Sequence, residues 1–254
     1  MSKIKHYLNA IYELSRLDFK LKYYGSALGL LWSFLKPLMM LVILYIVFFY
    51  FLKVQIPNYE LYLFLGIIFW NFFADTTKES AQNIIAKAPL LQKTNLPPFV
   101  IVISVVIHSL WTFLITLGIF FIFFFSLGFH LTLTTLIFCF LLLLFVMLTA
   151  GTAFLIVPLH ARFKDFGHIW DIILQMLFWA TPVVYQYSLV PQAYVKWYLL
   201  NPVARILIDA QNTLLYHFSP EFKQLAITTG ITVVIFLMGW IVFKKYGRAC
   251  IEEL

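Results

Sequence analysis

The side chains of this protein that could bind a ligand are mostly aromatic rings. Several of them lie in or beside one segment that separates two long apolar runs. Residues 188–222 are too many for a simple turn and too apolar for a solvated loop. Five rings lie in or beside this segment: Tyr185, Tyr187, Tyr194, Trp197 and Tyr198. Such rings can stack on sugar faces while their polar tips bond to hydroxyl groups, which would suit a re-entrant segment lining an exit path. The alternative is an aromatic belt at a membrane surface.

Other reactive arrangements are missing from the sequence. His160 and His168 lack the i, i+4 spacing and the carboxylate of a helical zinc site. His108 lies deep in an apolar run, where we expect it to face a neighbouring helix. There is no G-x-x-x-x-G-K-[ST] phosphate loop and no nucleophile beside an acid–base pair. We therefore expect no metal site and no catalysis, and if ATP drives the protein, a separate subunit hydrolyses it.

The composition is that of a membrane protein. Hydrophobic residues make up 63% of the chain and charged residues 11%, where a soluble domain has about 25% charged residues. From Thr94 to Phe129 there is no Asp, Glu, Lys or Arg. This run is longer than the roughly 20 residues that a helix needs to cross a bilayer.

The apolar runs are continuous rather than alternating, which favours helices over a barrel. Six runs are candidate spans: 35–52, 61 to about 83, 99–125, 132–159, 172–187 and 224–243. Six spans put both termini on the same side. We therefore expect an all-α integral membrane protein in which residues 1–254 form a single transmembrane domain, with short re-entrant helices between spans five and six.

Basic residues indicate the orientation, because Lys and Arg concentrate in short cytoplasmic loops. With both termini inside, only four of the 18 basic residues lie outside: Lys53, Lys196, Arg205 and Lys223. The net charge of +7 is then explained by topology and by contact with membrane lipids, and no nucleic-acid partner is expected.

Residues 1–24 have the pattern of an interface helix rather than of a cleavable signal peptide. Apolar residues recur there at helical spacing: Ile4, Tyr7, Leu8, Ile11, Leu14, Leu17 and Leu21. Asn9, Glu13, Arg16 and Lys20 form a polar face. Such a helix lies in the membrane surface, either as a lipid anchor or as a docking site for a partner.

Two charged loops are expected on the inner side. Lys87 and Pro89 interrupt the second helix. Residues 90–95 then form a short helix or turn closed by Pro97 and Pro98, or only a loop. The second loop contains Arg162, Lys164 and Asp165, which could simply mark the topology. On the outer side, Asn201 can cap a helix that begins at Pro202 and ends near Tyr216.

The order of these segments resembles the membrane subunits of type-2 ABC exporters, specifically those that export polysaccharide and teichoic acid. The strongest match is residues 18–26, followed by Leu28, Gly29, Trp32, Lys36 and Pro37. Weaker matches are Lys93 with Leu96 and Pro97, the Arg162 loop, residues 181–185, and Asn201 with Pro202.

The resemblance implies a homodimer of six-span subunits in the bacterial inner membrane, with both termini cytoplasmic. Two ATP-binding cassette subunits would bind ATP and Mg, while this chain would hold no cofactor. The substrate would be a lipid-linked glycan resembling O-antigen. The alternatives are export of a small molecule or lipid and, from another class, a structural scaffold.

The resemblance also assigns roles to residues. An element at 84–95 would couple to the ATPase through Lys87, Leu90, Leu91, Gln92, Lys93 and Asn95. The interface helix would meet the lipid pyrophosphate through Arg16, Lys20, Lys22 and Tyr23, because cations at headgroup depth favour phosphate. The five aromatic rings of the outer region would line the glycan path and its outer gate.

Overall fold

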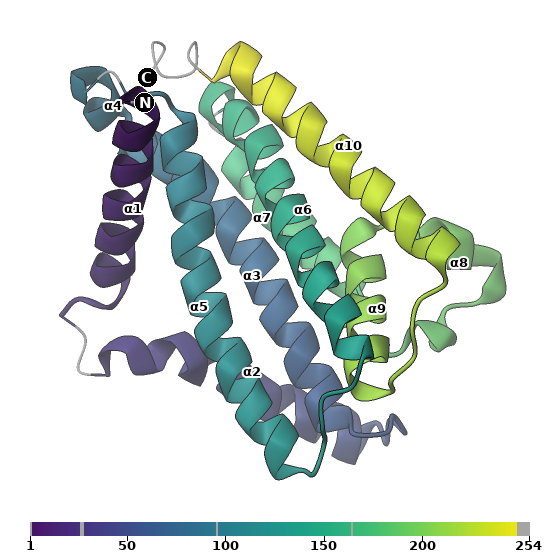
Figure 1. Cartoon of the computed structure of the whole chain (residues 1–254). Helices are drawn as coiled ribbons and strands as arrows, with labels where there is room; N and C mark the ends of the chain where they lie inside the picture. The colour runs from purple at the N-terminus through teal and green to yellow at the C-terminus, as the bar shows by residue number, and fades with distance from the viewer. Residues whose placement is uncertain (1, 26–27, 95, 164, 248–254) are drawn as a thin grey trace.

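The computed structural model of the chain is a bundle of long helices (Figure 1). The structure describes residues 2–25, 28–94, 96–163 and 165–247, so Asn95, Lys164 and Ser26 of the amino-terminal motif lie outside the described residues. Within this part of the chain the regular structure is all helical, as predicted. The elements are α1 (Ser2–Tyr23), η1 (Gly29–Leu31), α2 (Trp32–Tyr45), η2 (Ile46–Phe51), α3 (Tyr59–Ala86), α4 (Ala88–Thr94), α5 (Phe99–Ser126), α6 (Thr134–Arg162), α7 (Phe166–Trp179), η3 (Tyr187–Leu189), α8 (Gln192–Tyr198), α9 (Pro202–Leu215) and α10 (Phe222–Tyr246).

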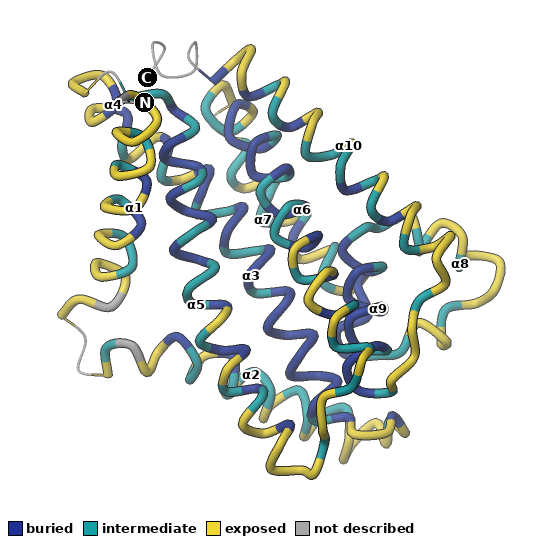
Figure 2. Tube along the Cα trace, viewed as in Figure 1, coloured by how far each residue is buried: buried dark blue, intermediate teal, exposed yellow. Residues whose placement is uncertain are grey.

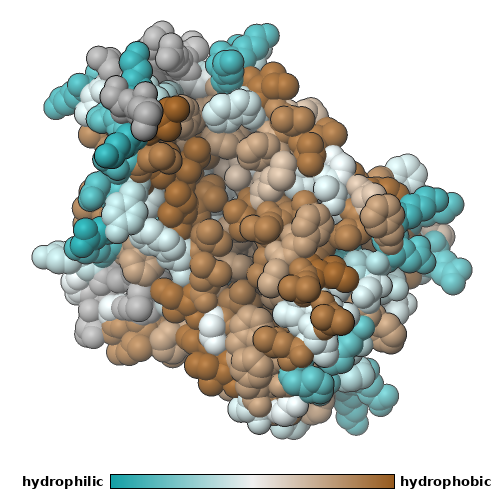
Figure 3. Space-filling view, viewed as in Figure 1, coloured by the Kyte–Doolittle hydropathy of each residue, from teal (hydrophilic) through white to brown (hydrophobic). Residues whose placement is uncertain are grey.

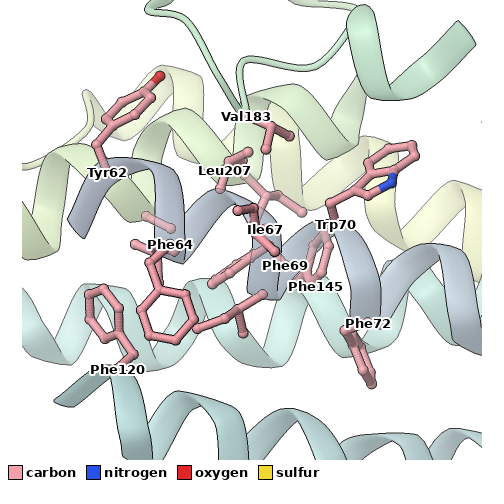
Figure 4. Close-up of a cluster of buried hydrophobic side chains, with 14 of the residues drawn as sticks. Tyr62, Phe64, Ile67, Phe69, Trp70, Phe72, Phe120, Phe145, Val183 and Leu207 are labelled. Carbon is pink, nitrogen blue, oxygen red and sulfur yellow. The ribbon is translucent and has the colours of Figure 1, made fainter. Parts of the chain in front are cut away.

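Helix α3 lies at the centre of the bundle, and Figure 2 shows it buried along most of its length. It packs against α2, α5, α6, α7 and α9. The first half of α3 is apolar on every side, and such a segment needs neighbours on every side. Figure 4 shows how they meet it: Phe69 of α3 contacts Phe145 of α6, with ring centroids 4.8 Å apart, and Val183 and Leu207 approach from another direction.

Four helical segments are long and apolar enough to cross a membrane: Trp32–Phe51, α5, α6 and α10. The first of them joins α2 to the π-helical turn η2. The bounds of α5, α6 and α10 lie within a few residues of the predicted spans. Apolar side chains also cover the middle of the face shown in Figure 3, while hydrophilic ones gather around its edges. The chain is a multi-pass membrane protein by these criteria.

The fifth predicted span, 172–187, was misplaced. Helix α7 begins at Phe166 and ends at Trp179, and the following residues form turns. Pro182 lacks an N–H and disfavours helical backbone at Thr181, so the helix stops although the apolar sequence continues. The 14 residues of α7 span only about 21 Å.

The two ends of the bundle differ in the elements they carry. The start of α1, helix α4 and the end of α10 lie at one end, whereas α8 and the start of α10 lie at the other (Figure 1). We call these the α4 end and the α8 end.

Helices α6 and α10 touch backbone to backbone. A Cβ atom added at Gly239 of α10 would lie 2.2 Å from the carbonyl oxygen of Gly151 in α6. A Cβ atom added at Gly151 would lie 2.6 Å from Cα of Phe236. Only glycine at both positions permits this approach, because backbone atoms cannot move aside as a flexible side chain can.

We expect Gly239→Ala to destabilise the protein by about 1–3 kcal/mol, because the added methyl group forces α6 and α10 apart. Gly230→Ala, in the same helix, is the matched control, since nothing lies within 4 Å of the added atom. That control should be neutral or slightly stabilising. Unfolding in detergent micelles measures both variants, and equal stability of the two would contradict this account of the contact.

Candidate functional site

Five ionisable side chains form a network at the α4 end. Lys87 Nζ lies 2.6 and 2.5 Å from the two carboxylate oxygens of Asp18. Lys22 Nζ lies 2.7 Å from Glu79 Oε1, and His108 Nε2 lies 2.7 Å from Glu79 Oε2. The network therefore ties α1 to α3, to the α3–α4 junction and to α5 through charge pairs that are partly or largely buried.

His108 does face a neighbouring helix, as expected, but its partner there is a carboxylate. Its Nδ1 lies 3.3 Å from the Ser104 carbonyl oxygen of its own helix and 4.0 Å from Asp18 Oδ2. The sequence analysis missed Asp18 and Glu79 as members of this site. The one available signal was the place of Asp18 at the head of the motif at 18–26.

The predicted coupling element divides into an inward and an outward face. Residues 88–94 form the short helix α4, so the segment is a helix rather than a turn or a loop. Lys87 points inward to Asp18, and Leu91 is buried against the apolar residues around Ile84. Leu90, Gln92 and Lys93 are exposed. Lys87 and Leu91 therefore hold the helix to its own bundle, while Leu90, Gln92 and Lys93 form an exposed outward face.

Helix α1 packs on α5 with one edge of its apolar surface. Ile11 and Ser15 are buried, and Ser15 Oγ lies 3.1 Å from the Ser104 carbonyl oxygen. The predicted apolar face is thus divided, because Ile4 and Leu8 are exposed.

The predicted phosphate-binding residues of α1 also differ in their surroundings. Arg16 and Lys20 are exposed, whereas Lys22 joins the network. The side chain of Tyr23 lies outside what the structure describes.

A cavity of about 380 Å³ adjoins the network. Its lining combines two lysines, Lys22 and Lys36, with a carboxylate, Asp75. The rest of the lining is largely apolar and includes Trp32, Met39, Ile68, Phe72 and Phe113. The cavity can therefore receive a ligand that carries an anionic group beside hydrocarbon.

The second inner loop follows α6 directly. Arg162 is the last residue of α6 and its guanidinium carbon lies 5.8 Å from the ring centroid of Phe163. Asp165 precedes α7, and both Arg162 and Asp165 are exposed. Nearby, Lys78 Nζ pairs with Asp171 Oδ1 at 2.8 Å, which joins α3 to α7.

The five predicted aromatic residues at the α8 end fall into two groups. The Tyr185 hydroxyl donates to the Trp179 carbonyl oxygen at 2.6 Å, and the Tyr198 hydroxyl donates to the Tyr185 hydroxyl at 3.3 Å. Burial raises the pKa of Tyr198, so it remains a donor. Tyr187, Tyr194 and Trp197 are exposed instead. The first two rings brace the fold, and the other three are available for contact.

Residues of α3 that the sequence analysis did not single out hold this region in place. The Tyr59 hydroxyl donates to the Val184 carbonyl oxygen at 2.9 Å. The Tyr62 hydroxyl lies 3.0 Å from the carbonyl oxygen of Pro182 and 2.8 Å from that of Tyr185. Apolar sequence around both tyrosines hides this role, because their partners lie more than a hundred positions away.

The predicted cap of α9 is confirmed. The Asn201 side-chain oxygen accepts from the Val203 N–H at 3.0 Å, and Pro202 is the first helical residue. Asn201 Nδ2 also lies 3.2 Å from Thr181 Oγ1, so the cap ties α9 to the turn after α7.

Among the described residues, no three His, Cys, Asp or Glu side chains are grouped so that they could hold a metal ion.

Comparison with known proteins gives one family. The sequence model of the ABC-2 type transporter family matches residues 9–215. O-antigen export system permease protein RfbA of Klebsiella pneumoniae is 28% identical over 249 residues, covering 96% of this chain and 95% of the relative. The protein of the same name from Myxococcus xanthus is 25% identical over 254 residues, covering 99% of this chain and 98% of the relative.

A double-mutant cycle on Asp18 and Lys87 should give a coupling energy of about 1–3 kcal/mol, because either single change leaves the other charge without its partner. The variants are Asp18→Asn, Lys87→Gln and the two combined, measured by unfolding in mixed micelles. The control cycle uses Lys78 and Asp171, whose side chains are 44% and 38% exposed, and should give less than about 1 kcal/mol. Equal coupling energies in the two cycles would show that the Asp18–Lys87 pair contributes no more to stability than an exposed ion pair does.

Proposed function

The chain belongs to the ABC-2 type transporter family, and on that basis we propose that it is the permease subunit of an ATP-driven exporter of lipid-linked polysaccharide. The glycan would be similar to an O-antigen and would leave the cytoplasm across the bacterial inner membrane. The observation that carries this proposal is similarity over nearly the whole chain to relatives named as O-antigen export permeases.

The proposed topology has six spans with both termini in the cytoplasm, within one transmembrane domain. The spans are α2 with η2, then α3, α5, α6, α7 and α10. Helices α8 and α9 are short re-entrant elements between spans five and six. The location of the start of α1 and the end of α10 at the same end of the bundle supports an even number of crossings.

The permease is proposed to work as a homodimer around a central conduit. Helix α2 is buried at only a few positions and presents exposed apolar side chains such as Met39, Val42 and Ile43. Helix α7 likewise exposes Ile172 and Met176. A second copy of the chain would cover these surfaces and enclose a path between them.

Energy would come from two ATP-binding cassette subunits that bind ATP and Mg at the α4 end. The outward face of α4, with Leu90, Gln92 and Lys93, would dock on them, beside the exposed Arg162 and Asp165 of the second inner loop. Lys87 would pass the resulting movement to Asp18 and thereby to α1. In this arrangement the chain is a transport subunit and does not itself hydrolyse nucleotide.

The cavity beside the network would receive the pyrophosphate end of the lipid carrier. Lys22 and Lys36 supply positive charge, and the apolar lining suits the first part of the lipid chain. Arg16 and Lys20, which are exposed on α1, would attract the same headgroup at the membrane surface. The largely apolar lining also favours the second candidate function, export of a small amphiphile or lipid.

In liposomes that hold the permease and its ATP-binding partner, we expect lipid-linked glycan to stimulate ATP hydrolysis and to be transported. Leu90→Ala and Lys93→Glu should lower transport at least about tenfold while the complex stays folded, since they alter only the outward face of α4. Leu91→Ala is the contrasting variant and should instead lower stability by about 2–5 kcal/mol, because the side chain is buried.

Stimulation by small amphiphiles and not by lipid-linked glycan would reject the polysaccharide assignment in favour of the second candidate. Unchanged transport in both Leu90→Ala and Lys93→Glu would reject α4 as the docking element.

Removing charge from the surface of α1 should weaken capture of the carrier lipid. Arg16→Ala combined with Lys20→Ala is expected to lower binding of a pyrophosphate-bearing lipid by roughly thirtyfold, because each basic residue near the surface contributes about 1 kcal/mol. Lys3→Ala combined with Lys5→Ala removes the same charge from the other end of α1 and should have a smaller effect. Flotation of the protein with labelled lipid vesicles measures the binding, and equal losses in the two double variants would indicate charge alone rather than a site.

A further inference from the structure

A polar cavity of about 370 Å³ lies at the α8 end, between residues of α8, of α9 and of the segment that leads into α10. Figure 1 shows these helices near one another. Its volume falls in the range of about 300–1,000 Å³ that is usual for small-ligand sites. Side chains able to bind a polar ligand line it: Tyr187, Arg205, Asp209, Asn212, Glu221 and Gln224. The cavity is separate from the one beside the charged network.

Three of these side chains come from one face of α9. Arg205, Asp209 and Asn212 are spaced i, i+4 and i+7, which places them in a row along the helix. The neighbouring face of α9 is apolar and packs into the bundle through residues such as Ile206 and Ala210. Capping by Asn201 and packing against α6 therefore fix the row in position.

The row includes two buried polar atoms that have no hydrogen-bond partner in the described part of the chain. Asp209 is only 6% exposed, yet its Oδ2 has no hydrogen-bond partner there, and Arg205 Nε is also unpartnered. A buried polar atom without a partner costs about 1–3 kcal/mol. Such atoms are normally satisfied by ordered water or by a ligand. The two residues that carry this donor and this acceptor line the cavity from adjacent turns of α9.

The mixture of charges selects the kind of ligand. An anion would meet the carboxylates of Asp209 and Glu221, and a cation would meet the Arg205 guanidinium. A neutral ring with several hydroxyl groups can satisfy both, because a hydroxyl donates to Asp209 and accepts from Arg205. The exposed ring of Tyr187 offers a flat surface for the apolar face of a sugar.

We propose that this cavity binds one neutral sugar ring of the glycan on the outer side of the membrane. The source of the sugar rests on the proposed function, whereas the binding chemistry rests on the cavity itself. Binding must be weak, because a polymer that is held tightly at one site cannot move on.

The test is ligand-observed NMR on the full-length protein in lipid nanodiscs, with methyl glycosides of glucose, galactose, mannose and rhamnose as probes. We expect binding of at least one glycoside, weakened about tenfold or lost in Asp209→Asn and in Tyr187→Leu. Lys223→Gln is the control, since Lys223 is exposed at the start of α10 and does not line the cavity. It should bind as the unmodified protein does.

Thermal unfolding checks that each variant is folded. If Asp209→Asn does not fold, Tyr187→Leu alone tests the site, because Tyr187 is exposed and its replacement should not disturb the fold. Calcium chloride and sodium phosphate are offered in parallel. The proposal is overturned if no glycoside binds, if glycoside binding is the same in a folded Tyr187→Leu variant, or if calcium or phosphate binds in an Asp209-dependent manner and glycosides do not.

Transport in liposomes separates this proposal from the function on which it partly rests. Export of lipid-linked glycan together with absent glycoside binding would overturn the cavity assignment alone. Stimulation of ATP hydrolysis only by small amphiphiles would overturn the proposed function, while glycoside binding that depends on Asp209 and Tyr187 would still support the cavity.

Discussion

The structure depends on the burial of one helix, α3, whose first half is apolar on all its sides. Helix α3 can satisfy its own backbone hydrogen bonds, but its side chains need partners in every direction, so α2, α5, α6, α7 and α9 all pack against it. The same helix fixes both candidate sites. Its first turn holds the turns after α7 through Tyr59 and Tyr62, and its last turns hold Glu79 and lead to Lys87.

The ion pairs at the α4 end contribute to the structure in a different way from the apolar packing around α3. A pair such as Lys87 and Asp18 gains little net stability over an apolar pair, but breaking it is costly. The Lys87–Asp18 pair therefore determines the position of α1 more than it raises the stability of the protein. The consequence for the proposed mechanism is that α1 and the α3–α4 junction move together, because separating them would expose two unpaired charges.

Sequence reasoning succeeded where one local rule decides the structure. Long runs without charge predicted α5, α6 and α10 closely, and the Asn201–Pro202 pair predicted the start of α9. It misplaced α7, because hydrophobicity continues through Pro182 while the helix cannot. It missed the charged network, because Asp18 and Lys87 are 69 positions apart and Glu79 and His108 are 29 apart, so no spacing rule connects them. Leu91 points inward because of how α4 packs on the bundle. Helix α4 has only seven residues, too few for the spacing of apolar residues to indicate which face is buried.

The glycine contact between α6 and α10 has a mechanical consequence. With backbone resting on backbone, no side chain lies between these helices at that point to absorb a change of angle, so the two form a stiff wall on one flank of the bundle. Any movement within the bundle would then have to occur away from this wall, for example at α2, which packs on α3 and α5. Helices α6 and α10 would stay fixed relative to each other while the other helices move.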